Sequence, residues 1–391
     1  MRREGTPAAS QLGLGEAVCL VAGAGIGGGV MAVPYLAAQA GFWPSLAIMG
    51  IAYLVTVVLH IMVAELSVRT GYASELLTVF TTHLFGRRPW LRGGFFVLMA
   101  VTLTCNLAAY VTGAGDILAE LVGFPGLAAK ALFFIAAAVV VALGLKRVAL
   151  NEVAWLLVML ALLALLVVRT ARLPAPEPLA PAHWAASPLL AVYGMAMFSL
   201  SSLFAVPQAA AGLRGAADAD AAGARRRLVS AVGLGLGVNL VIMVAITACA
   251  LSASSPVTEV AIIGWAGALG GATHGLGSAF IVSAMLTTFW SISLQLSDMT
   301  RAFLRSGRLV AWLVATMPAF GLTLLPLTGF LALMQFAGGA TAVVVALMVV
   351  PAYANAVRGR GGLLLGRSGN RRGVYATVIT MYVAMAVASF V

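Results

Sequence analysis

A glycine-rich interruption near the start of the chain places the strongest constraint on its fold. Residues 14–40 form a long apolar segment, and glycine occupies positions 23, 25, 27, 28 and 29 within it. Each glycine destabilises a helix by roughly 1 kcal/mol relative to alanine, so this cluster predicts a break. In a lipid bilayer, unwound backbone is tolerated only where its N–H and C=O groups face protein or a water-filled cavity. The break therefore predicts a binding site within a membrane.

The second half of the chain carries a related interruption. Residues 30–34 read Val-Met-Ala-Val-Pro and residues 203–207 read Leu-Phe-Ala-Val-Pro, so Pro34 and Pro207 are 173 positions apart. The serines of residues 198–202 interrupt the apolar segment just before the second proline. Two broken helices at corresponding positions of two halves are typical of secondary transporters.

Composition decides which class of protein can contain these breaks. The chain of 391 residues is 62% hydrophobic and 9% charged, with a mean hydropathy of +1.05, which excludes an ordinary water-soluble domain. The net charge of +11 is carried by Lys and Arg residues between apolar segments, without interleaved aromatic residues, so we expect no nucleic-acid partner. The three cysteines lack metal-ligand spacing. No motif predicts a bound cofactor.

Eleven apolar segments reach the length of about 20 residues that a membrane-spanning helix needs. They cover residues 14–40, 43–69, 92–122, 126–145, 149–171, 188–212, 227–252, 275–304, 308–326, 328–357 and 373–391. A short helix on the inner membrane face is predicted for residues 74–85.

These segments predict an all-α polytopic membrane protein built from two repeats of five spans. The expected parts are a tail at 1–13, a first repeat at 14–171, a Pro-rich outer linker at 172–187, a second repeat at 188–357, a basic loop at 358–372 and an eleventh helix at 373–391. Because five is odd, the second repeat is inverted relative to the first.

The Lys and Arg residues predict the orientation in the membrane. With the N-terminus in the cytoplasm, 20 of the 23 Lys and Arg residues are cytoplasmic, because only Lys130, Arg169 and Arg172 fall outside. This positive-inside bias predicts a multi-pass protein of the cell inner membrane with a cytoplasmic N-terminus and an external C-terminus.

The residues around the first break resemble a known family signature. Residues 23–42, GAGIGGGVMAVPYLAAQAGF, resemble the first span of the amino acid/auxin permeases and the hydroxy/aromatic amino acid permeases. Both groups belong to the amino acid–polyamine–organocation superfamily. The resemblance implies a LeuT-type fold whose first and sixth spans unwind around an amino acid. It also implies alternating access, with helices one, two, six and seven rocking against the rest.

The absence of charge at the membrane midplane favours a neutral substrate. No Asp, Glu, Lys or Arg lies clearly at the middle of a span, and an unpaired ion there costs several kcal/mol. A zwitterion needs only dipoles. The N–H groups after the first break suit its carboxylate, and the carbonyl groups of residues 198–201 suit its ammonium. The first-span residues predicted to contact substrate are Ala24, Gly25, Ile26, Gly27, Gly28 and Gly29.

Side chains of the third and sixth spans complete the predicted substrate site. Thr102, Asn106 and Tyr110 are spaced by four and share one helix face. The sixth span contributes Phe198, Ser199, Ser201, Ser202 and Phe204. Structural roles stay open for both kinds of residue. The polar side chains could form hydrogen bonds between membrane helices, and the phenylalanines could serve in packing alone. A neutral amino acid is the expected substrate, an aromatic side chain stays open, and the oligomeric state is not predicted.

A coupling ion is expected at the eighth span. Thr287 and Thr288 resemble the sodium site of this fold, in which the partners would be carbonyl groups of Ala22 and Gly25. The two hydroxyls could instead bond to the preceding turn of their own helix. The superfamily's second sodium site uses an asparagine where this chain has Gly29, which argues against a second sodium. The coupling cation, Na⁺ or H⁺, stays open.

Two groups of the second span are candidates for carrying a proton. His60 can change its charge near neutral pH, and Glu65 lies one turn further toward the cytoplasm. We favour structural roles for both. His60 is expected to form an interhelical hydrogen bond, and Glu65 is expected to pair with Arg69 on the same helix face.

Other classes of protein fit the sequence less well. Glycines 23, 25 and 28 match a dinucleotide-binding fingerprint, but that fingerprint requires a preceding strand and an acidic residue about 20 positions later. The next acidic residue is Glu65. We therefore expect no enzyme. A channel is less favoured because no charge ring or pore-loop repeat is present. A membrane amino acid sensor that does not transport stays open, since it would bind the same ligand through the same motif.

Overall fold

The structure is a computed structural model that describes residues 12–143, 145–173, 184–213, 221–325, 329–358, 364–366, 369 and 371–389. The side chains of residues 145–156, 221–222 and 272 are not described. Most of the predicted tail at 1–13, the Pro-rich linker at 172–187 and the basic loop at 358–372 lies outside these residues. In the described part of the chain, all regular elements are helices.

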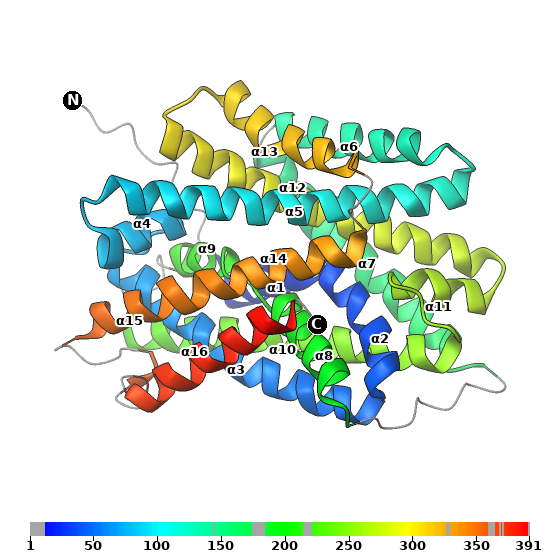
Figure 1. Ribbon diagram of the computed structural model, residues 1–391, viewed down its shortest axis with the longest axis horizontal. Coiled ribbons are helices and arrows are strands. Elements are labelled where there is room, and N and C mark those ends of the chain that lie inside the picture. Colours follow the sequence, from blue (N-terminus) through cyan, green and yellow to red (C-terminus); the bar gives the residue numbers. More distant parts are fainter. Residues whose placement is uncertain are drawn as a thin grey trace.

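The helices follow one another along the chain with short connections (Figure 1). The first half contains α1 (Leu14–Gly25), α2 (Gly28–Ala40), α3 (Phe42–Arg69), α4 (Leu76–Phe80), the π-helix η1 (Thr81–Phe85), α5 (Pro89–Val122), α6 (Gly126–Leu143) and α7 (Leu145–Thr170). The second half contains α8 (Ala186–Ser199), α9 (Ala205–Gly212), α10 (Ala221–Ala253), α11 (Ala261–Leu269), α12 (Ala272–Leu304), α13 (Arg308–Thr323), α14 (Phe330–Val344), the π-helix η3 (Val345–Val349), α15 (Val350–Val357) and α16 (Arg372–Ala388).

The expected all-α polytopic fold is confirmed, although fewer helices than expected have full membrane length. Among the described residues, six helices are long and apolar enough to cross a membrane, and α1 with α2 forms a seventh as one bent span. The helices α8, α13 and α16 contain 14, 16 and 17 residues. They are shorter than the span of about 20 residues. The polar interruption ends α8 early. The eleven-span count and the inverted five-plus-five repeat therefore stay predictions.

Both expected breaks are present at the centre of the molecule. The helices α1 and α2 meet at an angle of 56°. The residue between them in the extended conformation is Gly27, with φ −139° and ψ −160°. The helix α8 ends at Ser199 and α9 begins at Ala205, so residues 200–204 separate the two helices. Figure 1 shows α1 and α9 on one side of the breaks and α2 and α8 on the other.

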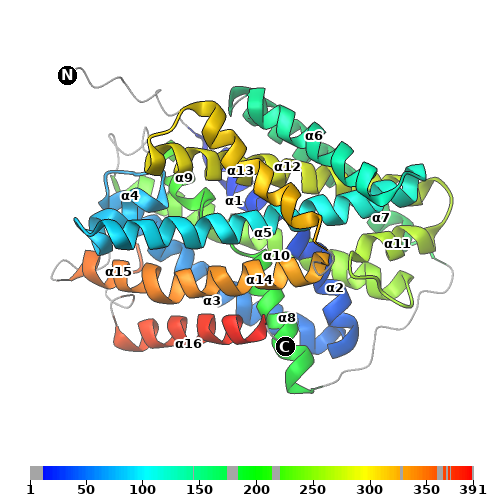
Figure 2. The ribbon, with the colours of Figure 1, turned by 45° about the horizontal axis from the view of Figure 1, so that its top comes forward.

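Helix packing places the breaks between two groups of helices. In the first group, α10 packs against α1, α2 and α3, while α8 packs against α2 and α3. In the second group, the long helix α5 packs against α6, α12, α13 and α14 (Figures 1 and 2). Small and apolar side chains fill the interior of both groups. The broken helices therefore line the boundary between the groups.

Two short elements lie outside the long helices. The helix predicted for residues 74–85 is present as α4 followed directly by η1. The helix α11, which packs against α12 and α10, was not expected. Its nine residues are too few for a membrane span, so its apolar segment did not predict one.

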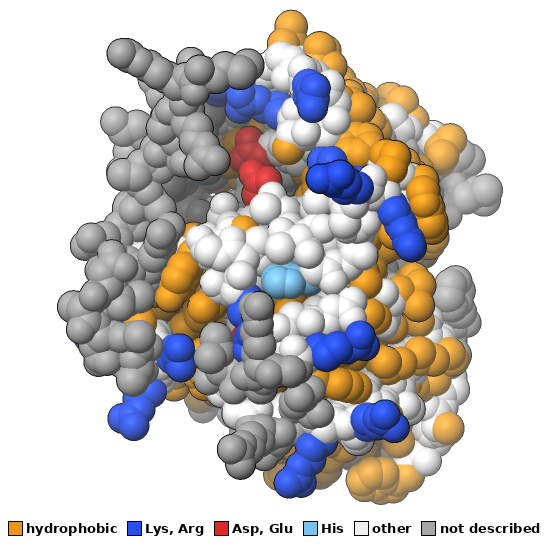
Figure 3. Space-filling view, turned by 90° about the vertical axis from the view of Figure 1, so that its left-hand side faces the viewer, with side chains coloured by type: hydrophobic (Ala, Val, Ile, Leu, Met, Phe, Trp, Pro, Cys, Tyr) orange, Lys and Arg blue, Asp and Glu red, His pale blue; other side chains and the backbone are white. Residues whose placement is uncertain are grey.

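One end of the molecule is rich in arginine, and we call it the arginine-rich end. It comprises the C-terminal ends of α3, α12 and α15 and the N-terminal ends of α5, α10, α13 and α16. Its described arginines are Arg69, Arg87, Arg88, Arg92, Arg225, Arg226, Arg227, Arg301, Arg305, Arg308, Arg358, Arg371 and Arg372. Figure 3 shows Lys and Arg side chains spread across this face. Lys130, Arg169 and Arg172 lie at the opposite ends of their helices.

Candidate functional site

A cavity of about 620 Å³ begins at the two breaks and lies between the two groups of helices. This volume is in the range of sites that bind small molecules. The cavity extends toward the arginine-rich end, where Leu12, Glu16 and Leu76 line it. In the opposite direction its lining stops at Gly29 of α2 and Phe198 of α8. The cavity therefore reaches from the centre of the molecule toward one end.

Most of the residues predicted to form the site line this one cavity. They are Ala24, Gly25, Gly27, Gly29, Asn106, Tyr110, Phe198, Ser199, Ser201, Ser202, Phe204, Thr287 and Thr288. The predicted residues Ala22, Ile26 and Gly28 do not line it. The side chains of Ala22 and Ile26 are buried in the protein core. Gly28 is covered by the rings of Tyr110 and Phe330.

The first break needs glycine because neighbouring helices contact its backbone closely. A Cβ atom on Gly27 would lie 2.7 Å from the Tyr110 hydroxyl of α5. A Cβ atom on Gly29 would lie 2.6 Å from Oγ of Ser199. At Gly25, a Cβ atom would clash with the Asn239 amide of α10. The glycines therefore let three other helices approach the unwound backbone.

A buried histidine holds the second break. The backbone N–H of Ser202 donates to His60 Nε2 at 2.8 Å, and His60 Nδ1 lies 2.7 Å from the Thr56 carbonyl oxygen. Because a backbone N–H can only donate, Nε2 accepts, and the ring proton is on Nδ1, where it bonds Thr56. His60 is therefore a neutral side chain that joins α3 to the unwound segment. This agrees with the interhelical role that the sequence favoured.

Further hydrogen bonds join the second break to α1 and to α10. The Ser202 hydroxyl donates to the Val21 carbonyl oxygen of α1 at 2.8 Å. The Asn239 amide of α10 donates to the Ser199 carbonyl oxygen at 2.8 Å. Both broken helices are therefore fixed to the same group of helices.

These hydrogen bonds reduce the number of carbonyl groups that a ligand can reach. Of the four carbonyl groups of residues 198–201, that of Phe198 accepts from Ser201 N–H at 2.9 Å, and that of Ser199 accepts from Asn239. Within the described part of the chain, no donor bonds the carbonyl groups of Leu200 and Ser201. Of the four carbonyl groups expected to suit an ammonium, those of Leu200 and Ser201 are therefore the ones without a described protein donor.

The predicted ion-binding threonines lie beside the first break, and Thr288 also contacts the Ile26 carbonyl group. The Thr288 hydroxyl is 2.8 Å from the Ala284 carbonyl oxygen and 3.2 Å from that of Ile26. The Thr287 hydroxyl also bonds Ala284, at 3.0 Å. Both hydroxyls thus bond back within α12. The packing of α12 thus brings Thr288 opposite the centre of the break, and the expected ion ligation by the carbonyl groups of Ala22 and Gly25 stays a prediction.

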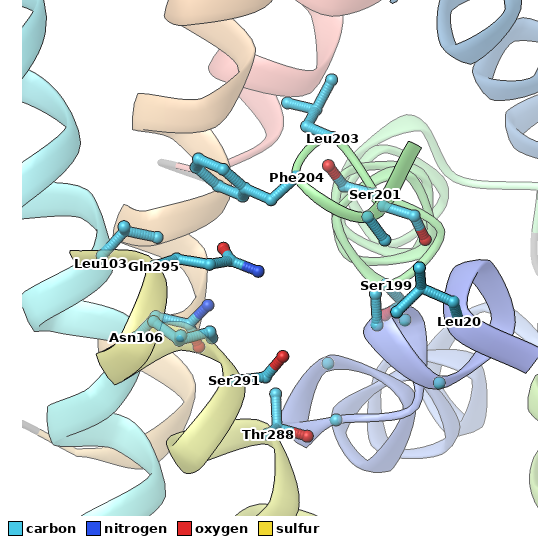
Figure 4. A pocket seen from close by; sticks show the side chains of 18 of the residues that line it. Leu20, Leu103, Asn106, Ser199, Ser201, Leu203, Phe204, Thr288, Ser291 and Gln295 are labelled. Carbon is cyan, nitrogen blue, oxygen red and sulfur yellow. The ribbon is translucent and has the colours of Figure 1, made fainter. Parts of the chain in front are cut away.

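Two polar side chains of the cavity were missed by the sequence analysis. Ser291 and Gln295 line it from α12 (Figure 4). They follow Thr288 by three and seven positions, which places all three on one helix face. The spacing that selected Asn106 and Tyr110 on α5 could have found them.

Charged groups pair at both ends of the helices, away from the breaks. Glu65 and Arg69 form the expected ion pair at 2.9 Å, and Glu65 is fully buried. At the opposite end, Lys130 of α6 is 3.3 Å from Asp116 of α5. Within the described residues, no group of three His, Cys, Asp or Glu residues could hold a metal ion.

Two titratable side chains near the arginine-rich end have shifted pKa values. Burial and the nearby Arg69 guanidinium lower the pKa of His83. Burial and the Asp298 carboxylate raise the pKa of Glu75. Both shifts oppose the charged form, as expected for groups that lose water without gaining an opposite charge.

Comparison with known proteins supports a transporter. Residues 11–203, just under half of the chain, match the model of the tryptophan/tyrosine permease family. No curated protein matches the chain.

Solved structures extend the comparison to the whole fold. A manganese transporter from Eremococcus coleocola, in complex with an aromatic bis-isothiourea substituted compound, is 16% identical with a TM-score of 0.67. The match covers 99% of this chain and 87% of that chain. Two mutants of that transporter match with the same identity and coverage and a TM-score of 0.64. The fold is therefore that of a multi-pass membrane transporter, and the first half of the chain is similar to aromatic amino acid permeases rather than to an enzyme.

Proposed function

We propose that this protein is a secondary active transporter that carries a neutral aromatic amino acid together with a cation. The observation that carries the proposal is the meeting of two broken helices at one cavity, with unpaired backbone groups beside it. The match of residues 11–203 to the tryptophan/tyrosine permease family supports an aromatic substrate.

The backbone at the breaks supplies the partners of a zwitterion. The first N–H groups of α2 have no partner within their own helix, and they form the positive end of a helix dipole that suits a carboxylate. The carbonyl groups of Leu200 and Ser201 follow the C-terminal end of α8 and suit an ammonium. No charged side chain is needed, which agrees with the neutral lining near the breaks.

The lining of the cavity favours an organic substrate over a metal ion. The structurally similar transporters carry manganese, but a likeness at 16% identity extends to the fold alone. A divalent cation requires several oxygen ligands, usually including carboxylates. Among the described lining residues the carboxylate is Glu16, which lies toward the arginine-rich end, away from the breaks.

Alternating access explains why the cavity extends toward one end only. We propose that the arginine-rich end is cytoplasmic, in accord with the positive-inside rule, so the cavity faces the cytoplasm. An outward-facing state would then close the lining around Leu12, Glu16 and Leu76 and open the side beyond Gly29 and Phe198.

Cation coupling is proposed at the boundary between the breaks and α12. The Thr288 hydroxyl and the Ile26 carbonyl oxygen are two hard oxygen atoms 3.2 Å apart, of the kind that binds a small cation. His60 is placed less well for proton transfer, because both of its ring nitrogens already have protein partners.

Uptake into proteoliposomes tests the proposal. Purified protein is assayed with radiolabelled tryptophan and tyrosine, with sodium and proton gradients imposed separately. We expect accumulation under one of the two gradients and none in protein-free liposomes. Binding of tryptophan without uptake under either gradient would favour a membrane sensor and contradict transport. Absence of both binding and uptake would contradict an aromatic substrate.

A further inference from the structure

Two amide side chains form an unsatisfied polar pair in the wall of the cavity. Asn106 of α5 is 8% exposed, and its Oδ1 has no hydrogen-bond partner in the described part of the chain. Oε1 of Gln295, from α12, is likewise buried and without a described partner. Figure 4 shows both side chains on the same wall, across the cavity from Ser199 and Leu20. Buried amide oxygens without a partner are uncommon in proteins.

The amides lie beyond the breaks, on the side toward the arginine-rich end. Asn106 precedes Tyr110 by four positions, and Gln295 follows Thr288 by seven. At a rise of 1.5 Å per residue, these spacings correspond to about 6 Å and about 10 Å along the two helices. Tyr110 and Thr288 themselves contact the first break. A ligand whose amino and carboxyl groups bind at the breaks can therefore extend its side chain toward the amides.

The surroundings of the amides suit a flat aromatic ring. Leu103, Leu203 and Phe204 line the cavity beside them (Figure 4). Apolar walls with a few convergent polar groups are typical of sites that orient a small molecule. A polar atom at the edge of the ring would lie within reach of these two amide oxygens and could satisfy them.

An amide group can match either an indole or a phenol. It carries both a donor and an acceptor, and its terminal torsion is soft enough to turn the oxygen toward a ligand. The indole N–H of tryptophan is a donor, and the phenol of tyrosine both donates and accepts. The ring of phenylalanine offers neither group and would leave the amides unpaired.

We infer that Asn106 and Gln295 determine specificity by hydrogen bonding to the polar edge of the substrate's aromatic ring. This inference rests on the proposed transport of aromatic amino acids and names the residues that select among them. Sites built to hydrogen-bond a substrate group reject analogues that lack it far more strongly than apolar pockets reject a missing methylene.

The first test needs only the wild-type protein. Inhibition of radiolabelled tryptophan uptake is measured with tyrosine, phenylalanine and 1-methyltryptophan, in which the ring N–H is replaced. We expect tyrosine to compete well, and phenylalanine and 1-methyltryptophan to compete at least about 100-fold more weakly. Equal competition by all three compounds would overturn the inference while leaving aromatic amino acid transport in place. Absence of aromatic uptake would overturn both.

The second test assigns the discrimination to the two amides. In Asn106→Leu and Gln295→Met, we expect the preference for tryptophan over phenylalanine to fall to within about tenfold, chiefly through weaker tryptophan binding. The matched control is Gln335→Met, because Gln335 is an amide on α14 that does not line the cavity. Retained phenylalanine uptake shows that a variant is folded. An unchanged preference in both folded variants would overturn the inference, and so would an equal loss in the control. If neither variant folds, the wild-type comparison decides.

Discussion

Replacing Gly27 with alanine tests the close approach at the first break. The added Cβ atom would lie 2.7 Å from the Tyr110 hydroxyl and 3.3 Å from Cγ2 of Thr288. Real Cβ atoms essentially never approach another heavy atom within 3.0 Å, so Tyr110 or the break must shift. Added methyl groups in packed sites typically destabilise by about 1–3 kcal/mol. We therefore expect Gly27→Ala to reduce both stability and tryptophan affinity, the latter by about 5- to 150-fold.

Gly23→Ala is a matched control within the same glycine cluster. Gly23 also lines the cavity, but a Cβ atom there would meet nothing within 4 Å. It belongs to α1, where alanine is favoured over glycine by roughly 0.5–1 kcal/mol. We therefore expect this variant to be as stable as wild type or slightly more stable, with less change in affinity than Gly27→Ala.

Thermal unfolding in detergent and equilibrium tryptophan binding measure the two effects separately. The comparison uses wild type, Gly23→Ala and Gly27→Ala at the same protein and detergent concentrations. Equal stability and equal affinity of the two variants would refute the reasoning, because the glycines would then matter only as helix breakers. The reasoning would also be refuted if Gly23→Ala lowered stability and affinity as much as Gly27→Ala does.

Three further substitutions test single contacts. His60→Leu leaves the Ser202 N–H unpaired, so we expect the free energy of unfolding in detergent to fall by about 1–3 kcal/mol. A fall of less than about 0.5 kcal/mol would contradict this expectation. Thr288→Val removes a proposed ion ligand, and we expect at least about a tenfold higher half-saturating sodium concentration in uptake; unchanged sodium dependence would exclude this role. Because the pKa of His83 is lowered, its contribution to the free energy of unfolding is present at pH values above 6.5, the ordinary pKa of histidine. This contribution is lost as the pH falls below 6.5. When unfolding is measured for both proteins under the same conditions, His83→Gln should therefore lose less stability than wild type between pH 7 and pH 5. An equal dependence of stability on pH in the two proteins would refute this. The opposite contribution of Glu75, whose pKa is raised, is common to both proteins and cancels.

Local sequence signals predicted the two breaks because their causes are local. Glycine destabilises a helix wherever it occurs, and the serines of residues 198–202 interrupt an apolar segment in any context. The polar face of the third span was equally predictable from sequence, since Asn106 and Tyr110 follow helical periodicity and both line the cavity. The same periodicity on α12 was available for Gln295 but was not applied beyond the threonine pair.

Contacts between distant segments could not be predicted in the same way. His60 and Ser202 are 142 positions apart, and Thr288 and Ile26 are 262 apart. Which carbonyl group faces Thr288 depends on the axial position of α12 relative to α1, and a shift of a single turn would select a different residue. Periodicity gives the face of a helix but not this axial position. The sequence therefore could not predict the contact of Thr288 with Ile26, although both threonines line the cavity as expected.

The hydrogen bonds at the breaks indicate which contacts can change during transport. The bonds of Ser202 with His60 and Val21, and of Asn239 with Ser199, all lie within the first group of helices. Across the cavity, the second group meets the first break through Tyr110 and Thr288. We expect a substrate bound between the groups to alter this second set of contacts more than the first. We therefore expect substitutions at His60 to change stability equally with and without substrate, and Gly27→Ala to change it more when substrate is present.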